Sequence, residues 1–293
     1  MSMFNIICFG EMLWDVLPDK ELPGGAPVNA AYHLQKLGQQ VAVISRVGND
    51  DHGRGLLSLL RDNHLSTAYV QQDTTHPTGS VLAQPISDHD VEYTFVYPVA
   101  WDFIEWQPAL EGLLQQAGYM VFGTLAARDE VTAATLDKLL QSGIKKVLDV
   151  NLRPPHFTQE QLVKFMQRCD ILKLNAAELE LISSWSGEFQ TKKDKVQAIS
   201  KEYNIPVIIV TMGGEGAMLY MHGQFFTHPG FKIQVADTIG SGDAFLAGFL
   251  SSLIQGRSPE HCLAFANATG ALVASRSGGQ PAYDISEVEA LIG

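Results

Sequence analysis

Short apolar runs rich in β-branched residues alternate with longer amphipathic stretches along most of this 293-residue chain. The strand-like runs cover residues 6–9, 41–45, 119–122, 146–150, 171–174 and 207–211. The stretches with helical periodicity cover residues 28–37, 53–60, 130–140, 159–167 and 176–183. A strand-then-helix repeat favours a mainly parallel sheet with helices on both faces, because parallel strands need crossover connections. The predicted fold class is therefore α/β.

Residues 69–103 break this alternation. Within them, residues 78–84 and 91–97 are strand-like, and a polar turn at 87–90 joins them without a long helix. This pattern predicts an antiparallel hairpin inserted into the α/β body, with another strand supplied by residues 12–22. The hairpin is interpreted as a lid over a site, and an antiparallel edge of the main sheet is the alternative.

Composition argues against several kinds of partner. The net charge of −12 opposes a broad surface for nucleic acid or anionic lipid. No apolar run reaches membrane-spanning length and the N-terminus lacks a basic segment, so no membrane is expected and the cytoplasm is the expected location. The scattered cysteines Cys8, Cys169 and Cys262 indicate free thiols. Without a linker or repeat, residues 1–293 are predicted to form one domain.

The strongest chemical signal is the run Asp237-Thr-Ile-Gly-Ser-Gly-Asp243, which leads into an apolar helix. A glycine-rich turn that enters a helix leaves N–H groups free to bind an anion, and the helix dipole adds positive charge there. A carboxylate at the same turn can accept a proton from an attacking hydroxyl. Taken alone, the motif is also compatible with a simple helix cap or with a dinucleotide loop lacking its third glycine. The sequence has no Gly-Lys-Ser/Thr, which excludes a P-loop.

A second run, Gly24-Gly-Ala-Pro-Val-Asn29, lies near the N-terminus and is followed by Gly38 and Gly48-Asn-Asp50. The two runs together resemble the two signatures of the ribokinase-like (PfkB) carbohydrate kinase family, and the similarity covers nearly the whole chain. This resemblance implies a ribokinase-like three-layer α/β/α sandwich with a central, mainly parallel sheet and a small β-sheet lid. It also implies an ATP-dependent sugar kinase that uses Mg²⁺ and transfers the γ-phosphoryl of ATP to a sugar hydroxyl.

The resemblance implies roles for the residues of the Asp243 motif. Asp243 would take the proton of the acceptor hydroxyl, and the N–H groups of Gly240, Ser241 and Gly242 would form the anion hole. Asp237 and the carbonyl of Ile239 fall where many members of the family bind K⁺, with the loop at 275–279 closing that site.

The sugar site is implied by the N-terminal signature. Gly24 and Gly25 would let the backbone approach the sugar closely, and Asn29 would bind a hydroxyl. Asp15 matches an N-terminal aspartate that binds two sugar hydroxyls. Each residue alone has an ordinary structural interpretation, as a turn or a helix surface residue.

Nucleotide contacts are implied at the Asn-x-x-Glu and Thr-x-Gly-x-x-Gly motifs and at one later helix. These residues are Asn175, Thr211, Gly213, Gly216 and Asn267. Glu178 would act on Mg²⁺ through water, because Mg²⁺ usually keeps several waters. Asn175 and Glu178 also fit a capping box, and the two roles are compatible. For Asn267 the alternative is a buried polar helix residue.

The choice of acceptor depends on weaker signals. The strand end Asp149-Val-Asn-Leu-Arg153 resembles that of fructokinases and 2-keto-3-deoxygluconate kinases, and Arg153 would reach a phosphate or the acceptor. Strand alternation predicts Tyr93, Phe95 and Tyr97 on one face of the lid, with Trp101 nearby. That face is interpreted either as part of the sugar pocket or as a homodimer surface.

Fructose is therefore the expected acceptor, and the chain resembles the fructokinase-like branch. The alternatives are a kinase for 2-keto-3-deoxygluconate or for a nucleoside. A non-catalytic sugar- or nucleotide-binding protein on the same scaffold is the hypothesis from a different functional class, and retention of Asp243 with the glycine turn argues against it.

Overall fold

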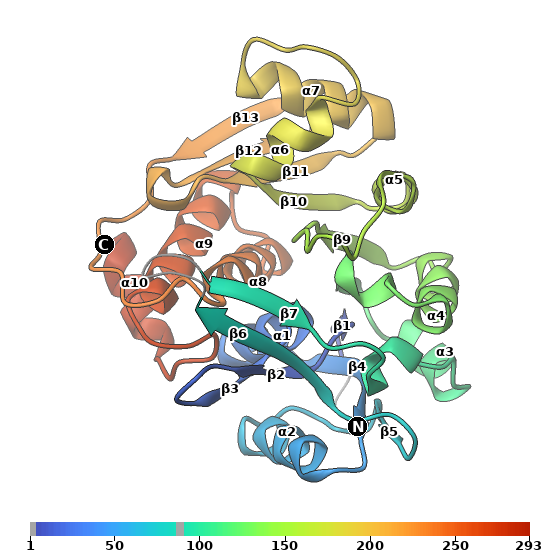
Figure 1. The fold of residues 1–293 in the computed structure, drawn as a ribbon. Coiled ribbons are helices and arrows are strands. Elements are labelled where there is room, and N and C mark those ends of the chain that lie inside the picture. The colour runs from blue at the N-terminus through green and yellow to red at the C-terminus, as the bar shows by residue number, and fades with distance from the viewer. Residues whose placement is uncertain (1–3, 86–90) are drawn as a thin grey trace.

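A nine-stranded sheet runs through the body of the protein in the computed structural model, which describes residues 4–85 and 91–293 (Figure 1). Its strand order is β13-β12-β11-β10-β9-β8-β1-β4-β5. The strands are β1 (Ile6–Phe9), β4 (Val41–Gly48), β5 (Val70–Asp73), β8 (Tyr119–Gly123), β9 (Lys145–Asp149), β10 (Ile171–Asn175), β11 (Val207–Thr211), β12 (Ala217–Met221) and β13 (Gln224–His228). Neighbours from β5 to β11 pair in parallel, and β12 and β13 add antiparallel pairs. The predicted mainly parallel α/β fold is confirmed.

Helices cover both faces of this sheet. One group comprises α1 (Ala26–Lys36), α2 (Asp51–Asp62), α8 (Ser241–Ile254), α9 (Pro259–Ala274) and α10 (Ile285–Ile292). The other comprises α3 (Ala109–Leu114), α4 (Glu130–Leu140), α5 (Gln159–Met166), α6 (Ala176–Ser183) and α7 (Lys192–Tyr203). No helix in the described residues is long and apolar enough to span a membrane.

The sheet separates two hydrophobic cores. In β1, Ile6 and Cys8 belong to the core shared with α1, α8 and α9, whereas Ile7 and Phe9 belong to the core shared with α4 to α7. Because side chains alternate across a strand, a fully apolar strand such as β1 serves both cores. This arrangement produces the three-layer sandwich. Cys8, Cys169 and Cys262 are buried in these cores as free thiols.

Several helices begin at a side chain that satisfies a free N–H of the first turn. Asp50 accepts a hydrogen bond from Gly53 N at the start of α2, and Thr158 and Ser258 cap α5 and α9 in the same way. Such caps fix where each helix starts relative to the strand before it.

A separate four-stranded sheet forms the lid, with the order β3-β2-β6-β7. Its strands are β2 (Leu13–Val16), β3 (Glu21–Gly24), β6 (Gly79–Pro85) and β7 (Val91–Phe95). In Figure 1 this sheet is drawn in front of α1. The small β-sheet lid is thus confirmed, in place of an edge of the main sheet.

The lid is shorter than the predicted segment 69–103. Strand β5 pairs with β4 and so extends the main sheet. Trp101 is wrongly predicted as a lid residue, because it lies in the 3-10 turn η1 (Ala100–Phe103), is 1% exposed and packs in the core under the guanidinium of Arg128. The predicted turn at 87–90 lies outside the described residues, as does the side chain of Tyr93.

Candidate active site

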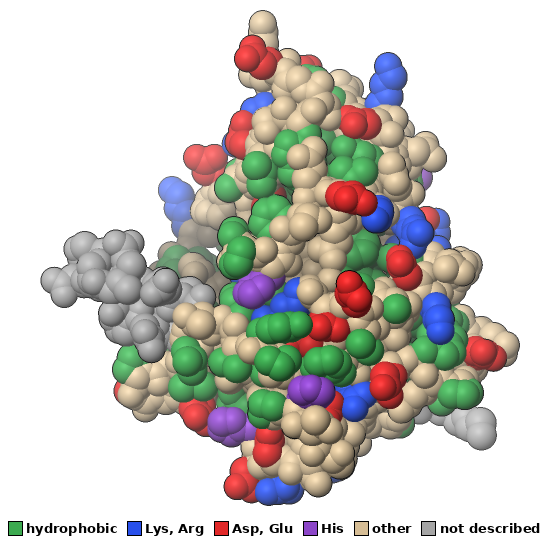
Figure 2. Space-filling view, turned by 45° about the vertical axis from the view of Figure 1, so that its right-hand side comes forward, with side chains coloured by type: hydrophobic (Ala, Val, Ile, Leu, Met, Phe, Trp, Pro, Cys, Tyr) green, Lys and Arg blue, Asp and Glu red, His purple; other side chains and the backbone are tan. Residues whose placement is uncertain are grey.

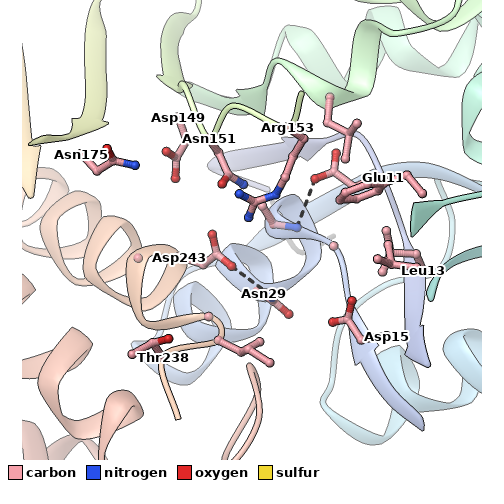
Figure 3. A pocket seen from close by; sticks show the side chains of 18 of the residues that line it. Glu11, Leu13, Asp15, Asn29, Asp149, Asn151, Arg153, Asn175, Thr238 and Asp243 are labelled. Atoms are coloured by element: carbon pink, nitrogen blue, oxygen red, sulfur yellow. Dashed lines mark hydrogen bonds between the residues drawn. The ribbon is translucent and has the colours of Figure 1, made fainter. Parts of the chain in front are cut away.

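A cavity of about 580 Å³ lies between the lid and the carboxyl ends of the parallel strands (Figure 3). Asp149, Asn175 and Thr211 line it from the ends of β9, β10 and β11, and Asp15 and Phe95 line it from the lid. Ligands of open α/β sheets commonly bind at this end of the strands. On the face shown in Figure 2, acidic and basic side chains are interspersed.

The glycine turn at the start of α8 forms one wall of the cavity. Gly240 has φ 72° as the N-cap, and a side chain there would lie 2.5 Å from the Cα of Gly279. Gly240 and Gly242 line the cavity, but Ser241 does not. The N–H and the hydroxyl of Ser241 both donate hydrogen bonds to the carbonyl of Thr238. The structure therefore brings Gly240 and Gly242 to the predicted anion site and turns the side chain of Ser241 away.

Asp243 lies in the first turn of α8 and faces the cavity. Its Oδ2 accepts a hydrogen bond of 2.9 Å from Asn29 Nδ2, and Gln280 Nε2 in turn donates to Asn29 Oδ1 at 3.0 Å. Burial raises the pKa of Asp243 to about 7, with a further rise from Asp149, against the opposing effects of Lys173, Asn29 and Arg153. A carboxylate with this pKa is suited to act as a general base near neutral pH.

A buried ion pair lies beside Asp243. Lys173 Nζ is 2.7 Å from Asp149 Oδ2 and 2.9 Å from Oδ1, and both side chains are 8% exposed. Burial alone would lower the pKa of Lys173, but Asp149, with smaller contributions from Asp243 and Glu178, raises it, so the ammonium stays charged. A side chain on Gly242 would lie 3.4 Å from Nζ, which places this positive charge next to the glycine turn.

The predictions gave no role to Lys173 or to the carboxylate of Asp149. The available signal was a single lysine inside the otherwise apolar strand Ile-Leu-Lys-Leu-Asn. Lysine is almost never fully buried unless it is paired, so a charge at that position indicates a partner on the neighbouring strand. The neighbouring strand supplies it, because Lys173 and Asp149 are paired residues of β10 and β9.

Asn175 and Glu178 form a capping box at the start of α6. Asn175 Oδ1 accepts from Glu178 N at 2.9 Å, and Glu178 Oε2 accepts from Asn175 N at 2.8 Å. The second oxygen of Glu178 accepts from Leu152 N at 2.9 Å. Each carboxylate oxygen of Glu178 thus accepts one backbone hydrogen bond, and its contact with Mg²⁺ through water stays a prediction. In the described residues no group of three acidic, histidine or cysteine side chains is arranged to hold a metal ion.

The remaining predicted nucleotide residues are less tightly grouped. Thr211 lines the cavity at the end of β11. Gly213 and Gly216 follow it with φ 57° and 81° and do not line the cavity. Asn267 lies in α9, buried, and its amide donates to the carbonyl of Leu263 at 2.7 Å. Its contact with a nucleotide stays a prediction.

The N-terminal signature builds the wall nearest the lid. Gly25 has φ 105°, and a side chain there would lie 2.4 Å from the carbonyl oxygen of Glu11. A side chain on Gly24 would lie 2.4 Å from Asp15 Oδ2. Gly25 is therefore required by close approach of the backbone and lines the cavity, whereas Gly24 does not line it and faces only side-chain atoms, which can move. Burial raises the pKa of Asp15 to about 6, and Arg153 partly opposes this rise.

Arg153 and Phe95 line the cavity, whereas Tyr97 does not. Strand β7 ends at Phe95, so the predicted alternation does not reach Tyr97. The Tyr97 side chain is 57% exposed and its hydroxyl donates to Asp129 Oδ2 at 2.9 Å. The prediction of Tyr97 as a pocket residue is corrected accordingly.

Glu11 lines the cavity and was also missed. Its Oε1 accepts from Ala26 N at 3.2 Å, at the beginning of α1. Burial raises the pKa of Glu11 to about 7, an effect that Asp243 increases and that Arg153 and backbone N–H groups reduce. Alternation could have indicated it, since Glu11 lies two residues before Leu13 and four before Asp15.

Asp237 joins the two loops beside the glycine turn. Its Oδ1 accepts from Ile239 N at 3.0 Å, and its Oδ2 accepts from Gly278 N at 3.0 Å. The structure therefore brings Asp237 and Ile239 together with the 275–279 loop, and cation binding there stays a prediction.

Comparison with known proteins gives consistent results. The model of the family described as "pfkB family carbohydrate kinase" matches residues 5–285. A probable chloroplastic fructokinase-6 of Arabidopsis thaliana is 29% identical, over 98% of this chain and 82% of that protein. A fructokinase of Escherichia coli is 30% identical, over 83% of this chain and 82% of that protein. The crystal structure of a fructokinase with bound ATP from Xylella fastidiosa superimposes with a TM-score of 0.87 at 24% identity, covering 99% and 98% of the two chains.

Proposed function

The chain belongs to the pfkB family of carbohydrate kinases, ATP-dependent phosphotransferases, and from this premise we propose that it phosphorylates fructose. The observation that carries the catalytic part of the proposal is Asp243. It lies at the start of α8 and accepts a hydrogen bond from Asn29, and burial raises its pKa to about 7.

The reaction follows from the arrangement of the wall residues. Asp243 accepts the proton of the acceptor hydroxyl. The oxygen of that hydroxyl attacks the γ-phosphorus of ATP, and ADP leaves. The N–H groups of Gly240 and Gly242 and the ammonium of Lys173 stabilise the charge on the transferred group. Mg²⁺ would accompany ATP and offset the charge of its phosphates, and Asn175, Glu178 and Thr211, which line the cavity, would hold them there.

Fructose is supported by two observations. The named relatives at 29% and 30% identity are fructokinases. In addition, Glu11, Asp15 and Asp243 line the cavity, and a neutral polyol suits an acidic wall better than an anion does. The second candidate is 2-keto-3-deoxygluconate, because the exposed guanidinium of Arg153 also lines the cavity and would pair with its carboxylate.

Three further features belong to the same proposal. Asp237 and the carbonyl of Ile239 bind K⁺. The hydrogen bond from Gly278 N to Asp237 supports this, because it holds the 275–279 loop against Asp237. The protein forms a homodimer through the lid, and Tyr97, just beyond the end of β7, is exposed. It acts in the cytoplasm.

The test is a measurement of ADP release with fructose, ribose, 2-keto-3-deoxygluconate and nucleosides, with K⁺ or Na⁺. Fructose should give the highest kcat/KM, and K⁺ should increase it. A higher kcat/KM with 2-keto-3-deoxygluconate than with fructose would make 2-keto-3-deoxygluconate the acceptor instead. Absence of acceptor-stimulated ADP release would overturn the kinase assignment of this site.

A further inference from the structure

One extended segment lines the cavity with every second residue. Glu11, Leu13, Asp15 and Leu17 all border the cavity, and Met12 between them is buried in the core. Successive side chains point to opposite sides of an extended backbone, so these residues share one face. In Figure 3, Glu11, Leu13 and Asp15 lie in a row across the cavity from Asp243. The wall therefore carries two carboxylates, one near the body and one in the lid.

The two oxygens of Glu11 have different surroundings. The residue is 3% exposed. Its Oε1 holds the N–H of Ala26 at the start of α1. Its Oε2 is buried and has no hydrogen-bond partner among the residues that the structure describes. Buried acceptors are nearly always paired, so an unpaired one in a cavity wall indicates a ligand that supplies the donor.

The chemistry of the site limits what that donor is. In its ionised form the Glu11 carboxylate only accepts hydrogen bonds, so the partner of Oε2 then carries an O–H or N–H. A phosphate of ATP offers anionic oxygens and would be repelled. Glu11 lies in the same row as Asp15 and across the cavity from Asp243 (Figure 3), which places it at the acceptor end of the cavity.

We propose that Glu11 Oε2 accepts a hydrogen bond from a hydroxyl of the acceptor sugar, at a position distinct from the hydroxyls bound by Asp15. This inference rests on the proposed function, since it requires a polyhydroxylated acceptor beneath the lid. Because Oε1 of the same carboxyl holds Ala26 N, Glu11 joins the bound sugar to the start of α1, the helix that carries Asn29.

The variant Glu11→Gln isolates the second oxygen. The amide oxygen of the new glutamine still accepts a hydrogen bond from Ala26 N. Its NH₂ group, which is a donor, takes the place of Oε2, the acceptor that faces the sugar. We expect KM for the acceptor to rise about 10- to 100-fold, the range for losing a hydrogen bond to a charged group, with KM for ATP and the melting temperature nearly unchanged.

Mono-deoxy analogues of the best acceptor identify the hydroxyl. One analogue should have a lower kcat/KM than the full acceptor with the wild-type enzyme. With Glu11→Gln, the same analogue and the full acceptor should have equal kcat/KM. Asp15→Asn is the matched control, and it should lose its discrimination at a different hydroxyl. If Glu11→Gln fails to fold, Glu11→Asp replaces it, because it stays an acceptor but reaches less far.

The outcomes separate this inference from the proposed function. If no sugar stimulates ADP release by the wild-type enzyme, the proposed function fails and this inference fails with it. If the wild-type enzyme is active and Glu11→Gln keeps KM within about twofold and discriminates every deoxy analogue as the wild type does, Glu11 only caps α1 and this inference alone is overturned.

Discussion

The amide of Asn29 donates a hydrogen bond of 2.9 Å to Oδ2 of Asp243, which links the start of α1 to the start of α8 across 214 positions of sequence. The carboxylate is thereby oriented in the cavity wall while its other oxygen stays available. Helices α1 and α8 also pack along the same core, so the two family signatures become one site.

Asp243→Asn should lower kcat by about 10²- to 10⁴-fold, the usual span for losing a general base. The amide has nearly the same shape, so sugar and ATP affinity should change little in calorimetric titrations. Asp62→Asn, on an exposed residue at the end of α2, is the matched control and should be silent. Unchanged turnover of Asp243→Asn would refute the role of Asp243 as the base.

The same substitution should stabilise the protein at pH 8. The pKa of Asp243 is raised from 3.8 in an ordinary aspartate to about 7 in the fold, so the folded state binds this proton more tightly. The contribution of Asp243 to stability therefore falls as pH rises from about 4 to 7, and its cost persists above pH 7. The neutral amide avoids this cost. Melting temperatures should be higher for Asp243→Asn than for wild type at pH 8, and nearly equal at pH 4.

Asn29→Ala should move the acid limb of kcat/KM to higher pH. The reaction needs ionised Asp243, so kcat/KM should rise through a pKa of about 7 in the wild type. The hydrogen bond from Asn29 favours the charged carboxylate, and its removal raises the pKa of Asp243 further. A pH–rate profile measures the shift.

Gln280→Ala is the control for Asn29, because Gln280 touches Asn29 and not Asp243. It should move the limb less than Asn29→Ala does. A limb that stays in place in Asn29→Ala would show that the hydrogen bond does not tune the base.

Gly216→Ala should destabilise the turn after β11. Gly216 has φ 81°, and its added Cβ would lie 2.0 Å from the carbonyl oxygen of His228. A strained backbone of this kind costs about 1–3 kcal/mol, so the melting temperature should fall by several degrees. Gly214→Ala, with open space around its Cβ, is the matched control and should keep the wild-type melting temperature. Equal melting temperatures for the two variants would contradict the positive φ and the close backbone approach at Gly216.

The sequence was sufficient to predict Gly25, Gly240 and Gly242 as cavity residues, although the motif residues Ser241, Gly213 and Gly216 do not line the cavity. Asp243 and Asn29 were both predicted, but not their mutual hydrogen bond, because it depends on how α1 and α8 pack. Lys173 and Glu11 were missed since neither stands in a motif, and a lone charge acquires a role only through its partner on another strand. Tyr97 was misplaced because periodicity does not reveal where a strand ends.

The Lys173–Asp149 pair provides the last prediction. Lys173→Met should lower kcat by about 10²-fold or more, as expected when a charge that stabilises the transferred group is removed. It also leaves the Asp149 carboxylate buried without its partner, which costs about 3–5 kcal/mol in stability. Lost activity in this variant alone would thus have two explanations, one catalytic and one structural.

The double variant Asp149→Leu/Lys173→Met separates them. It replaces a buried pair by apolar side chains of similar size, a change that is often neutral or stabilising. If Lys173 acts on the transferred phosphoryl, the double variant should melt near the wild-type temperature while kcat stays about 10²-fold low. Recovery of both stability and turnover would instead mean that the pair only fills the space between β9 and β10.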